Sequence, residues 1–565
     1  MSKVGFGRFE SLLSELKRRR VFRVAAAYVV IAFAALQAVD VVAPALRLPE
    51  YTLTLFVILA LIGFIAAVGL AWAFDVVPGG SPVTAEQDEA TRVSAARAHV
   101  LAPASDMPCV AVMPFLNLSP DAENEYFADG MTEDVIASLS KIRALRVISR
   151  GSVMPFKERG QSLERIAATL GATTVVDGSV RRAGDRVRIV AKLIDTTTDR
   201  HLWAETYDRR LTDIFAIQSD VAFHIAAALR TELSLDEQAR IRQEPTGSME
   251  AYDLYRKGRS LLIHFTPDSM ERAIDFFERA LAADPSYALA HASIAIAYAE
   301  LGEGGMMPAD VARPRAAAAV ASALRLDPAL SEAHAAAGYI MSVWEFDWVG
   351  AEAAFRRALE LSPSNADAYD LYGRMCRSLG RFDEALELIR RAQELDPLAH
   401  RTDVANALLR AGRYEEAVLE AGRAVEFQPG DARAHATLAW AYLKQGKAEE
   451  GLAELERAVA LTPHHVQWLA QLGQARAMTG DEAAARAILR QLEQRAAAGF
   501  VSPYHLAYVH TGLGEHERAL DLLERALDEG SGSVHGISGS VLFAPLREHP
   551  RFKALVARIN PAAAT

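Results

Sequence analysis

Four acidic side chains near the start of one helical segment have the residue types of a calcium-binding loop. Asp121, Glu123, Glu125 and Asp129 follow the spacing 1, 3, 5 and 9 of such a loop. A calcium loop also needs a glycine at its sixth position and a bidentate glutamate at its twelfth, where this chain has Thr132. The sequence therefore predicts solvated acids ahead of a helix N-terminus, with no metal bound.

Other residues with reactive side chains also lack the spacing of a known site. His464 and His465 are adjacent, so they cannot both face one ligand from a helix. The glycine-rich segment Gly530–Ser533 has neither the preceding strand nor the following lysine of a phosphate loop. Cys109 and Cys376 form no CxxC pair. We therefore expect no cofactor and no enzymatic activity, although a triad dispersed along the sequence stays open.

A repeated spacing organises the second half of the chain. A small residue is followed four places on by a large or aliphatic residue in most units, then by alanine three places later and proline five places after that. Small residues let two helices approach closely, and proline ends the second helix of each unit. A period of about 34 residues is typical of a helical solenoid. The prolines are Pro285, Pro328, Pro363, Pro397, Pro429 and Pro463.

The first helix of each unit should line a concave groove at spacings i, i+3, i+7, i+10 and i+11. An aromatic residue flanked by basic ones suits an extended peptide that carries acidic groups. The alternative is an ordinary solvated inner face. The candidate partner-binding residues are Asp370, Arg374, Arg377, Trp440, Lys444 and Gln474.

Units such as ADAYDLYGRMCRSLG followed by FDEALELIRRAQELDP resemble the tetratricopeptide repeat. The resemblance covers residues 250–531, about eight units, and implies that the chain binds a protein or peptide. The paired lysine and asparagine with which some relatives hold a C-terminal carboxylate are not found. Regularity fails at the insertion Glu303–Arg313, at the turn Trp344–Trp348 and after residue 466. Within the final region, 532–565, Val541–Asn560 should form an amphipathic cap.

Residues 108–235 alternate short apolar strands with helices. They resemble the TolB amino-terminal-like domain through the segments VAVMPFLNLSPDAENEYFADGMTEDVIASLSKI, GATTVVDGSVRRAGDRVRIVAKLIDTTTDRHLWAETYDR and DIFAIQSDVAFHIA. The resemblance implies a small α/β domain without a catalytic role. The expected strands are Cys109–Phe115, Leu145–Ser149, Thr173–Arg181, Arg186–Ile194 and His201–Tyr207, and the expected helices are Asn124–Lys141, Ser162–Leu170 and Thr212–Leu233.

The N-terminal part of the sequence predicts a membrane hairpin. Residues 1–20 are basic, 21–75 contain the apolar runs Val21–Val39 and Tyr51–Phe74, and 76–107 form a linker. Two long runs argue against a cleaved signal peptide. Because lysine and arginine precede the first run, we expect the N-terminus and the soluble domains to be cytoplasmic. A periplasmic soluble part is the alternative.

The predicted fold class is mostly α: a transmembrane hairpin, a small α/β domain and a helical solenoid. The net charge of −11 argues against nucleic acid as a partner. We expect a scaffold or adaptor of the bacterial inner membrane, in signalling or envelope assembly. The domain order also resembles membrane-anchored repeat proteins labelled adenylate cyclases. The alternative function is therefore a regulatory relative of cyclase-linked sensors whose α/β domain binds a small effector. The oligomeric state is left open.

Overall fold

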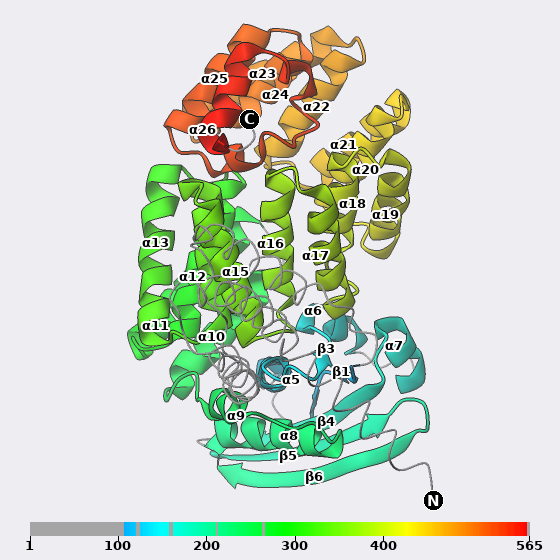
Figure 1. Ribbon diagram of the computed structural model, residues 1–565, viewed down its shortest axis with the longest axis vertical. Coiled ribbons are helices and arrows are strands. Elements are labelled where there is room, and N and C mark those ends of the chain that lie inside the picture. The colour runs from blue at the N-terminus through cyan, green and yellow to red at the C-terminus, as the bar shows by residue number, and fades with distance from the viewer. Residues whose placement is uncertain (1–106, 120–124, 158–161, 211–212, 263–265, 562–565) are drawn as a thin grey trace, which may run out of the picture. The chain divides into compact units, whose positions relative to one another are not determined.

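The computed structural model describes residues 107–119, 125–157, 162–210, 213–262 and 266–561. The two runs predicted to cross a membrane, Val21–Val39 and Tyr51–Phe74, lie outside these residues. Within the described residues, the helices are all too short or too polar to span a bilayer. What the structure describes is a mostly helical repeat array joined to a small mixed sheet (Figure 1).

The sheet has the strand order β3-β1-β4-β5-β6, and the short strand β2 also pairs with β4. β1 runs parallel to β3 and β4, whereas β4, β5 and β6 are antiparallel. The strand expected over Cys109–Phe115 is shorter in the structure and ends at Val112, ahead of Pro114, which has no amide to donate; the short strand β2 follows beyond it. The strands are β1 (Cys109–Val112), β2 (Leu116–Asn117), β3 (Arg146–Val147), β4 (Thr174–Ala183), β5 (Arg186–Asp195) and β6 (Arg200–Arg210).

Helices cover this sheet, and one of them is shorter than predicted. The closing helix expected over Thr212–Leu233 ends at Ala228, and a second helix follows. Ser234 and Glu237 form a reciprocal capping box that starts this second helix, and Arg230 adopts a left-handed φ of 53° between the two. The helices are α5 (Glu125–Ser140), α6 (Arg150–Val153), α7 (Leu163–Leu170), α8 (Ile214–Ala228) and α9 (Leu235–Arg242).

The repeats are consecutive helix pairs, as the proline period predicts. The first helices are α10 (Met249–Leu262), α12 (Ala288–Glu303), α14 (Ser331–Ile340), α16 (Ala366–Ser378), α18 (Arg401–Arg410), α20 (Ala432–Lys444), α22 (Val466–Met478) and α24 (Pro503–Gly512). Their partners are α11 (Pro267–Ala283), α13 (Ala309–Leu326), α15 (Trp348–Leu361), α17 (Phe382–Leu395), α19 (Tyr414–Phe427), α21 (Ala448–Leu461), α23 (Glu482–Ala498) and α25 (His516–Asp528). A final helix, α26 (Pro550–Ile559), packs on α25.

Small residues sit where paired helices touch. A Cβ on Gly373 of α16 would lie 2.5 Å from Ile389 Cγ1 and 3.1 Å from the Ala385 carbonyl oxygen of α17. A Cβ added to Gly422 of α19 would meet no atom within 4 Å. Alanine substitution at Gly373 therefore changes both packing and helix propensity, whereas alanine substitution at Gly422 changes helix propensity alone.

We expect Gly373→Ala to lower the free energy of unfolding by about 1–2 kcal/mol, because overpacking outweighs the better helix propensity of alanine. The matched variant Gly422→Ala should raise it by about 0.5–1 kcal/mol, because only propensity changes. Urea denaturation of both variants measures the difference. Equal stabilisation of both would show that α16 and α17 are not in close contact.

Buried polar contacts hold the sheet domain against the repeats. Arg256 of α10 pairs with Glu133 and Asp134 of α5. Asp396, after α17, accepts hydrogen bonds from the hydroxyls of Ser149 and Ser152. These contacts join α5 and α6 to the first and fourth repeats.

The last repeats contact the second, third and fourth repeats through the segment Ser531–Leu546, which we call the C-terminal strap. Part of the segment expected to be an amphipathic cap, Val541–Asn560, thus lies in the strap, and within that segment only α26 is α-helical. The strap contains the 3₁₀ turns Gly532–Gly536 and Ala544–Leu546. Ser533 donates to the Glu303 carbonyl at 2.6 Å and Ser538 to the Ser378 carbonyl at 2.7 Å. The strap therefore crosses the C-terminal ends of α12 and α16.

The irregular positions of the sequence form the surface that receives this C-terminal part. Met341–Glu345 is a π-helix, and the adjoining Trp348 donates its indole N–H to the Ile559 carbonyl at 3.0 Å. A Cβ on Gly305, in the insertion, would lie 2.8 Å from His505 Cε1. The insertion and the aromatic turn thus contact repeats distant in sequence.

Candidate functional site

The inner face of the repeats encloses a cavity of about 2060 Å³. Its wall is formed by the first helices of the repeats, from α10 to α24, as the groove spacing predicted. Residues of α5, α6, α8 and α9 also line it, and so do Ser540, Val541 and Leu542 of the strap. The concave face is therefore bordered by the sheet domain and by the strap as well as by the repeats.

The structure divides the six candidate residues into two groups. Asp370, Arg374, Arg377 and Trp440 line the cavity, but Lys444 and Gln474 are not among its lining residues. Gln474 is fully buried, and its amide donates to the Leu542 carbonyl of the strap at 2.6 Å. Its role is thus to hold the strap.

Trp440 is buried in the wall of the cavity. Only 3 % of the residue is exposed, and its indole N–H donates to Gln471 Oε1 at 2.9 Å. A tryptophan in this position packs α20 against α22 and offers little surface to a ligand. The aromatic anchor expected from sequence is therefore a packing residue.

Arg374 ties α16 to α12. Its guanidinium donates to Glu300 Oε1 at 2.9 Å, to Glu303 and to the Tyr339 hydroxyl at 3.0 Å. Burial opposes ionisation of Glu303, but Arg374, His535 and the Tyr339 hydroxyl together outweigh burial and lower the pKa of that carboxyl to about 2. Glu300 occupies the i+11 groove position of its unit, so applying the groove spacing to that unit would have found it, whereas Glu303 lies one turn beyond the last groove position.

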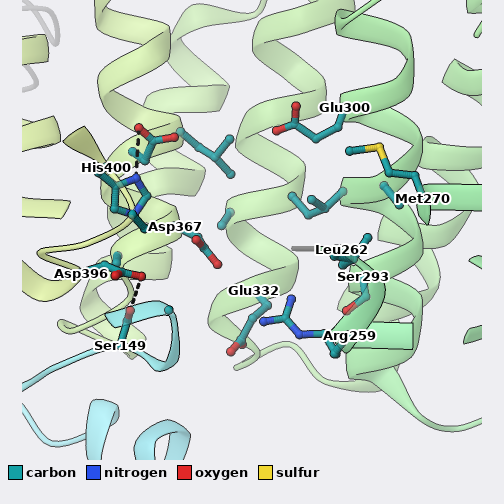
Figure 2. A pocket seen from close by; sticks show the side chains of 18 of the residues that line it. Ser149, Arg259, Leu262, Met270, Ser293, Glu300, Glu332, Asp367, Asp396 and His400 are labelled. Carbon is teal, nitrogen blue, oxygen red and sulfur yellow. Dashed lines mark hydrogen bonds and ion pairs between the residues drawn. The ribbon is translucent and has the colours of Figure 1, made fainter. Parts of the chain in front are cut away.

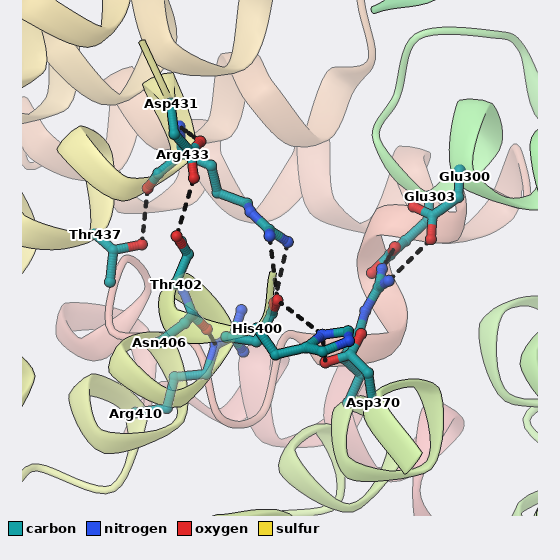
Figure 3. A network of polar contacts seen from close by, with 12 residues as sticks. Glu300, Glu303, Asp370, His400, Thr402, Asn406, Arg410, Asp431, Arg433 and Thr437 are labelled. Carbon is teal, nitrogen blue, oxygen red and sulfur yellow. Dashed lines mark hydrogen bonds and ion pairs between the residues drawn. The ribbon is translucent and has the colours of Figure 1, made fainter. Parts of the chain in front are cut away.

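A buried histidine lies between two carboxylates on the same wall (Figure 3). His400 Nδ1 is 3.7 Å from Asp370 Oδ1 and 3.8 Å from Asp403 Oδ2, which are ion-pair distances. Burial opposes the charge, but Asp403, Asp370 and Asp396 raise the pKa of His400 to about 9. Burial and neighbouring Asp403 raise the pKa of Asp370 to about 6. His400 is therefore an imidazolium at neutral pH. Sequence reasoning missed it because it precedes α18 in a turn.

Asp370, His400 and Asp403 also offer one ligand atom each within 4.8 Å of one another, which is a candidate arrangement for a metal ion. Arg433 already donates to both oxygens of Asp403, at 3.0 and 3.1 Å. A metal ion would have to compete with that guanidinium. The imidazolium lies at ion-pair distance from both carboxylates without displacing Arg433, so we interpret the cluster as an ion-pair network.

This network should make stability depend on pH. A histidine whose pKa rises from 6.5 to about 9 on folding stabilises the fold fully below pH 6.5, and the stabilisation is lost as pH rises towards 9. We expect the unfolding free energy to fall by on the order of 3 kcal/mol between pH 6.5 and 9 through this group. Urea denaturation of His400→Gln should show a flatter profile, and His201→Gln, an exposed control on β6, the wild-type profile. Parallel profiles for wild type and His400→Gln would contradict the assignment.

The part of the cavity nearest the sheet domain is rich in acids (Figure 2). Glu332 and Asp367 are exposed to it, and buried Asp396 contacts Ser149 at its edge. Arg259 lies opposite Glu332. Lys141, Arg150 and Arg240 line the same part of the cavity, so acidic and basic side chains are mixed beside the sheet domain. Arg374, Arg377, Arg410 and Arg433 line the cavity from α16, α18 and α20.

Comparison with known proteins identifies the class of the helical region. Two tetratricopeptide repeat models match, one at residues 347–400 and 436–499 and the other at 408–460. The helical region therefore contains tetratricopeptide repeats, and such repeats suggest a protein-binding scaffold.

Individual proteins resemble only part of this chain. A protein of Rhizobium meliloti (strain 1021) named "Putative adenylate cyclase 3" is 45 % identical over 189 residues, which are 34 % of this chain and 32 % of that protein. The chain thus spans about a third of the length of this relative. The human IFIT1 dimer with m7Gppp-AAAA is 19 % identical and covers 55 % of this chain and 77 % of its own, with a TM-score of 0.37. YrrB, described as a TPR protein with an unusual peptide-binding site, is 25 % identical over 34 % of this chain and 95 % of its own, with a TM-score of 0.24.

Proposed function

We propose that this chain is a non-enzymatic scaffold that holds a segment of a protein partner in the cavity formed by its repeats. The cavity carries the proposal. Its volume of about 2060 Å³ exceeds the roughly 300–1,000 Å³ typical of small-molecule pockets. Its wall presents both acidic and basic side chains, as a polar peptide segment requires. The carboxylates nearest His400 and Arg374 are engaged in ion pairs, which supports a binding role over acid–base catalysis.

Site-specific photo-crosslinking in cells tests the proposal. A photoreactive amino acid at Asp367 faces the cavity, and one at Val349, which is 77 % exposed on α15, lies outside it. We expect one partner to be captured from Asp367 and not from Val349, with the cross-link mapped by mass spectrometry to a single segment of that partner. Capture from neither position, or equally from both, would show that the cavity is not the binding surface.

We also propose that Val21–Val39 and Tyr51–Phe74 anchor the chain in a bacterial inner membrane, with the repeats in the cytoplasm. The charge bias of the N-terminus supports this orientation. Lys553→Cys adds an exposed thiol on α26, while the natural thiols of Cys109 and Cys376 are fully buried. Labelling of Lys553→Cys by a membrane-impermeant reagent in intact cells would place the repeats outside the cytoplasm and support a role in envelope assembly.

A second candidate function is the regulation of a cyclase-linked system through an effector bound to the α/β domain. The relative of Rhizobium meliloti named as an adenylate cyclase favours it. Calorimetric titration of the full-length protein with nucleotides separates the two candidates. Saturable binding that survives substitutions in the repeat cavity would favour the effector role.

A further inference from the structure

Arg377 is a buried cation without an ionic partner in the described part of the chain. It lies in the last turn of α16, is 8 % exposed and lines the cavity. Among the described residues, its guanidinium makes neither a hydrogen bond nor an ion pair, and its Nε atom is fully buried. A buried charge of this kind costs free energy unless another group compensates it.

The neighbouring charges cannot supply that compensation. Glu300 and Glu303 are bound by Arg374, while Asp403 is shared by Arg433 and His400. Asp370 also faces His400. The nearby acids are therefore already engaged with other cations.

A second arginine in the same region has no carboxylate partner among the residues that the structure describes. Within that part of the chain, Arg410 of α18 donates only to neutral oxygens, Asn406 Oδ1 at 3.2 Å and the Gly536 carbonyl at 3.0 Å. Burial, and then the charges of Arg410 and Arg374, lower the pKa of Arg377 to about 9. This region of the cavity thus has a positive charge to which an anionic ligand is complementary.

We propose that Arg377, together with Arg410, binds a side-chain carboxylate of an acidic segment in the protein partner. This assignment rests on the proposed function, since it specifies what the cavity recognises. Arginine presents a planar set of donors that matches a carboxylate in two parallel hydrogen bonds. The volume of the cavity favours a peptide segment over a free anion.

Binding of defined probes to the full-length protein in detergent tests the inference. We expect fluorescein-labelled hexaglutamate to bind and hexaglutamine not to bind, as measured by fluorescence anisotropy. Arg377→Gln should weaken the affinity for hexaglutamate at least about 30-fold. Arg377→Lys should weaken this affinity less, because lysine keeps the positive charge but not the paired donors. Arg390→Gln, an exposed arginine of α17, should leave it unchanged. Equal affinity of wild type and Arg377→Gln, or failure of wild type to bind hexaglutamate, would overturn the inference.

Inorganic phosphate separates a peptide site from a site for a free anion. We expect millimolar phosphate to leave hexaglutamate bound at constant ionic strength. If phosphate displaces the peptide at comparable concentration, the site recognises free anions and the assignment to a partner segment is wrong.

Thermal stability distinguishes a binding role from a structural one. Because Arg377 lacks an ionic partner, Arg377→Gln should raise Tm by about 2 °C in the absence of ligand. A lower Tm would show that Arg377 stabilises the fold itself. Cross-linking from Asp367 then tells the two proposals apart. If wild type and Arg377→Gln capture the partner equally, the proposed function is supported and the inference about Arg377 is wrong. If wild type captures nothing, the proposed function itself fails.

Discussion

Arg256→Ala should lower the free energy of unfolding by about 3–5 kcal/mol, because it removes one partner of a buried ion-pair network and leaves the other charges buried. The Arg256 side chain is 4 % exposed. Its guanidinium lies 2.5 Å from Glu133 Oε2, pairs with Asp134 and donates to the Gly130 carbonyl at 2.7 Å. Removing it leaves two carboxylates between α5 and α10 with less compensation. Urea denaturation followed by circular dichroism measures the loss.

The protonation of these carboxylates gives the prediction a pH signature. Burial raises the pKa of Asp134 to about 6, although Arg256 opposes the shift. Without Arg256, that pKa should rise further, so the variant should recover part of its stability as pH falls from 7 towards 5. The control is Arg272→Ala, whose exposed partner Asp268 lies 3.9 Å away on α11 and whose loss should cost less than about 0.5 kcal/mol. A loss below about 1 kcal/mol for Arg256→Ala would mean that the network does not hold the two domains together.

The sequence predicted the elements that depend on local pattern. The spacing of alanine and proline predicted the helix pairs, because each unit packs mainly on its neighbours and the packing contacts recur at equivalent positions of each unit. The sheet hairpin followed from alternation, because β5 buries Val187, Ile189 and Ala191 on one face. The capping box at Ser234 was a readable signal for the division between α8 and α9.

The closure of the array could not be predicted in this way. A strap that joins Ser533 to Glu303 and Ser538 to Ser378 pairs residues far apart in sequence, and no period relates them. Contacts of this kind also bury two of the residues that the sequence predicted to bind a partner. Gln474 occupies a groove position by spacing, yet the strap covers it, and Trp440 is buried against Gln471. Spacing identified the inner face of the array, but burial and ion pairing decide which of its side chains remain available to a ligand.

Phe543 should anchor the strap. It is fully buried, and its ring centroid lies 5.2 Å from that of Tyr504, 5.3 Å from that of Tyr508 and 6.4 Å from that of Phe552. Phe543→Ala removes these contacts and leaves a cavity between α24, α26 and the strap, which should cost about 3–5 kcal/mol. Phe500→Ala, at a position 40 % exposed before α24, should cost much less.

The location of the loss matters as much as its size. The hydrogen bonds of Leu542, Ser538 and Ser533 depend on the strap lying across the ends of α22, α16 and α12. Without Phe543, we expect faster amide hydrogen exchange throughout Ser531–Leu546 and at the π-helix Met341–Glu345 that the strap covers, while β4 and β5 keep their protection. Exchange measured by mass spectrometry on Phe543→Ala and Phe500→Ala resolves these segments. Uniformly faster exchange in Phe543→Ala, reaching the sheet, would mean that Phe543 stabilises the whole chain; unchanged exchange in the strap would mean that its polar contacts alone keep the array closed.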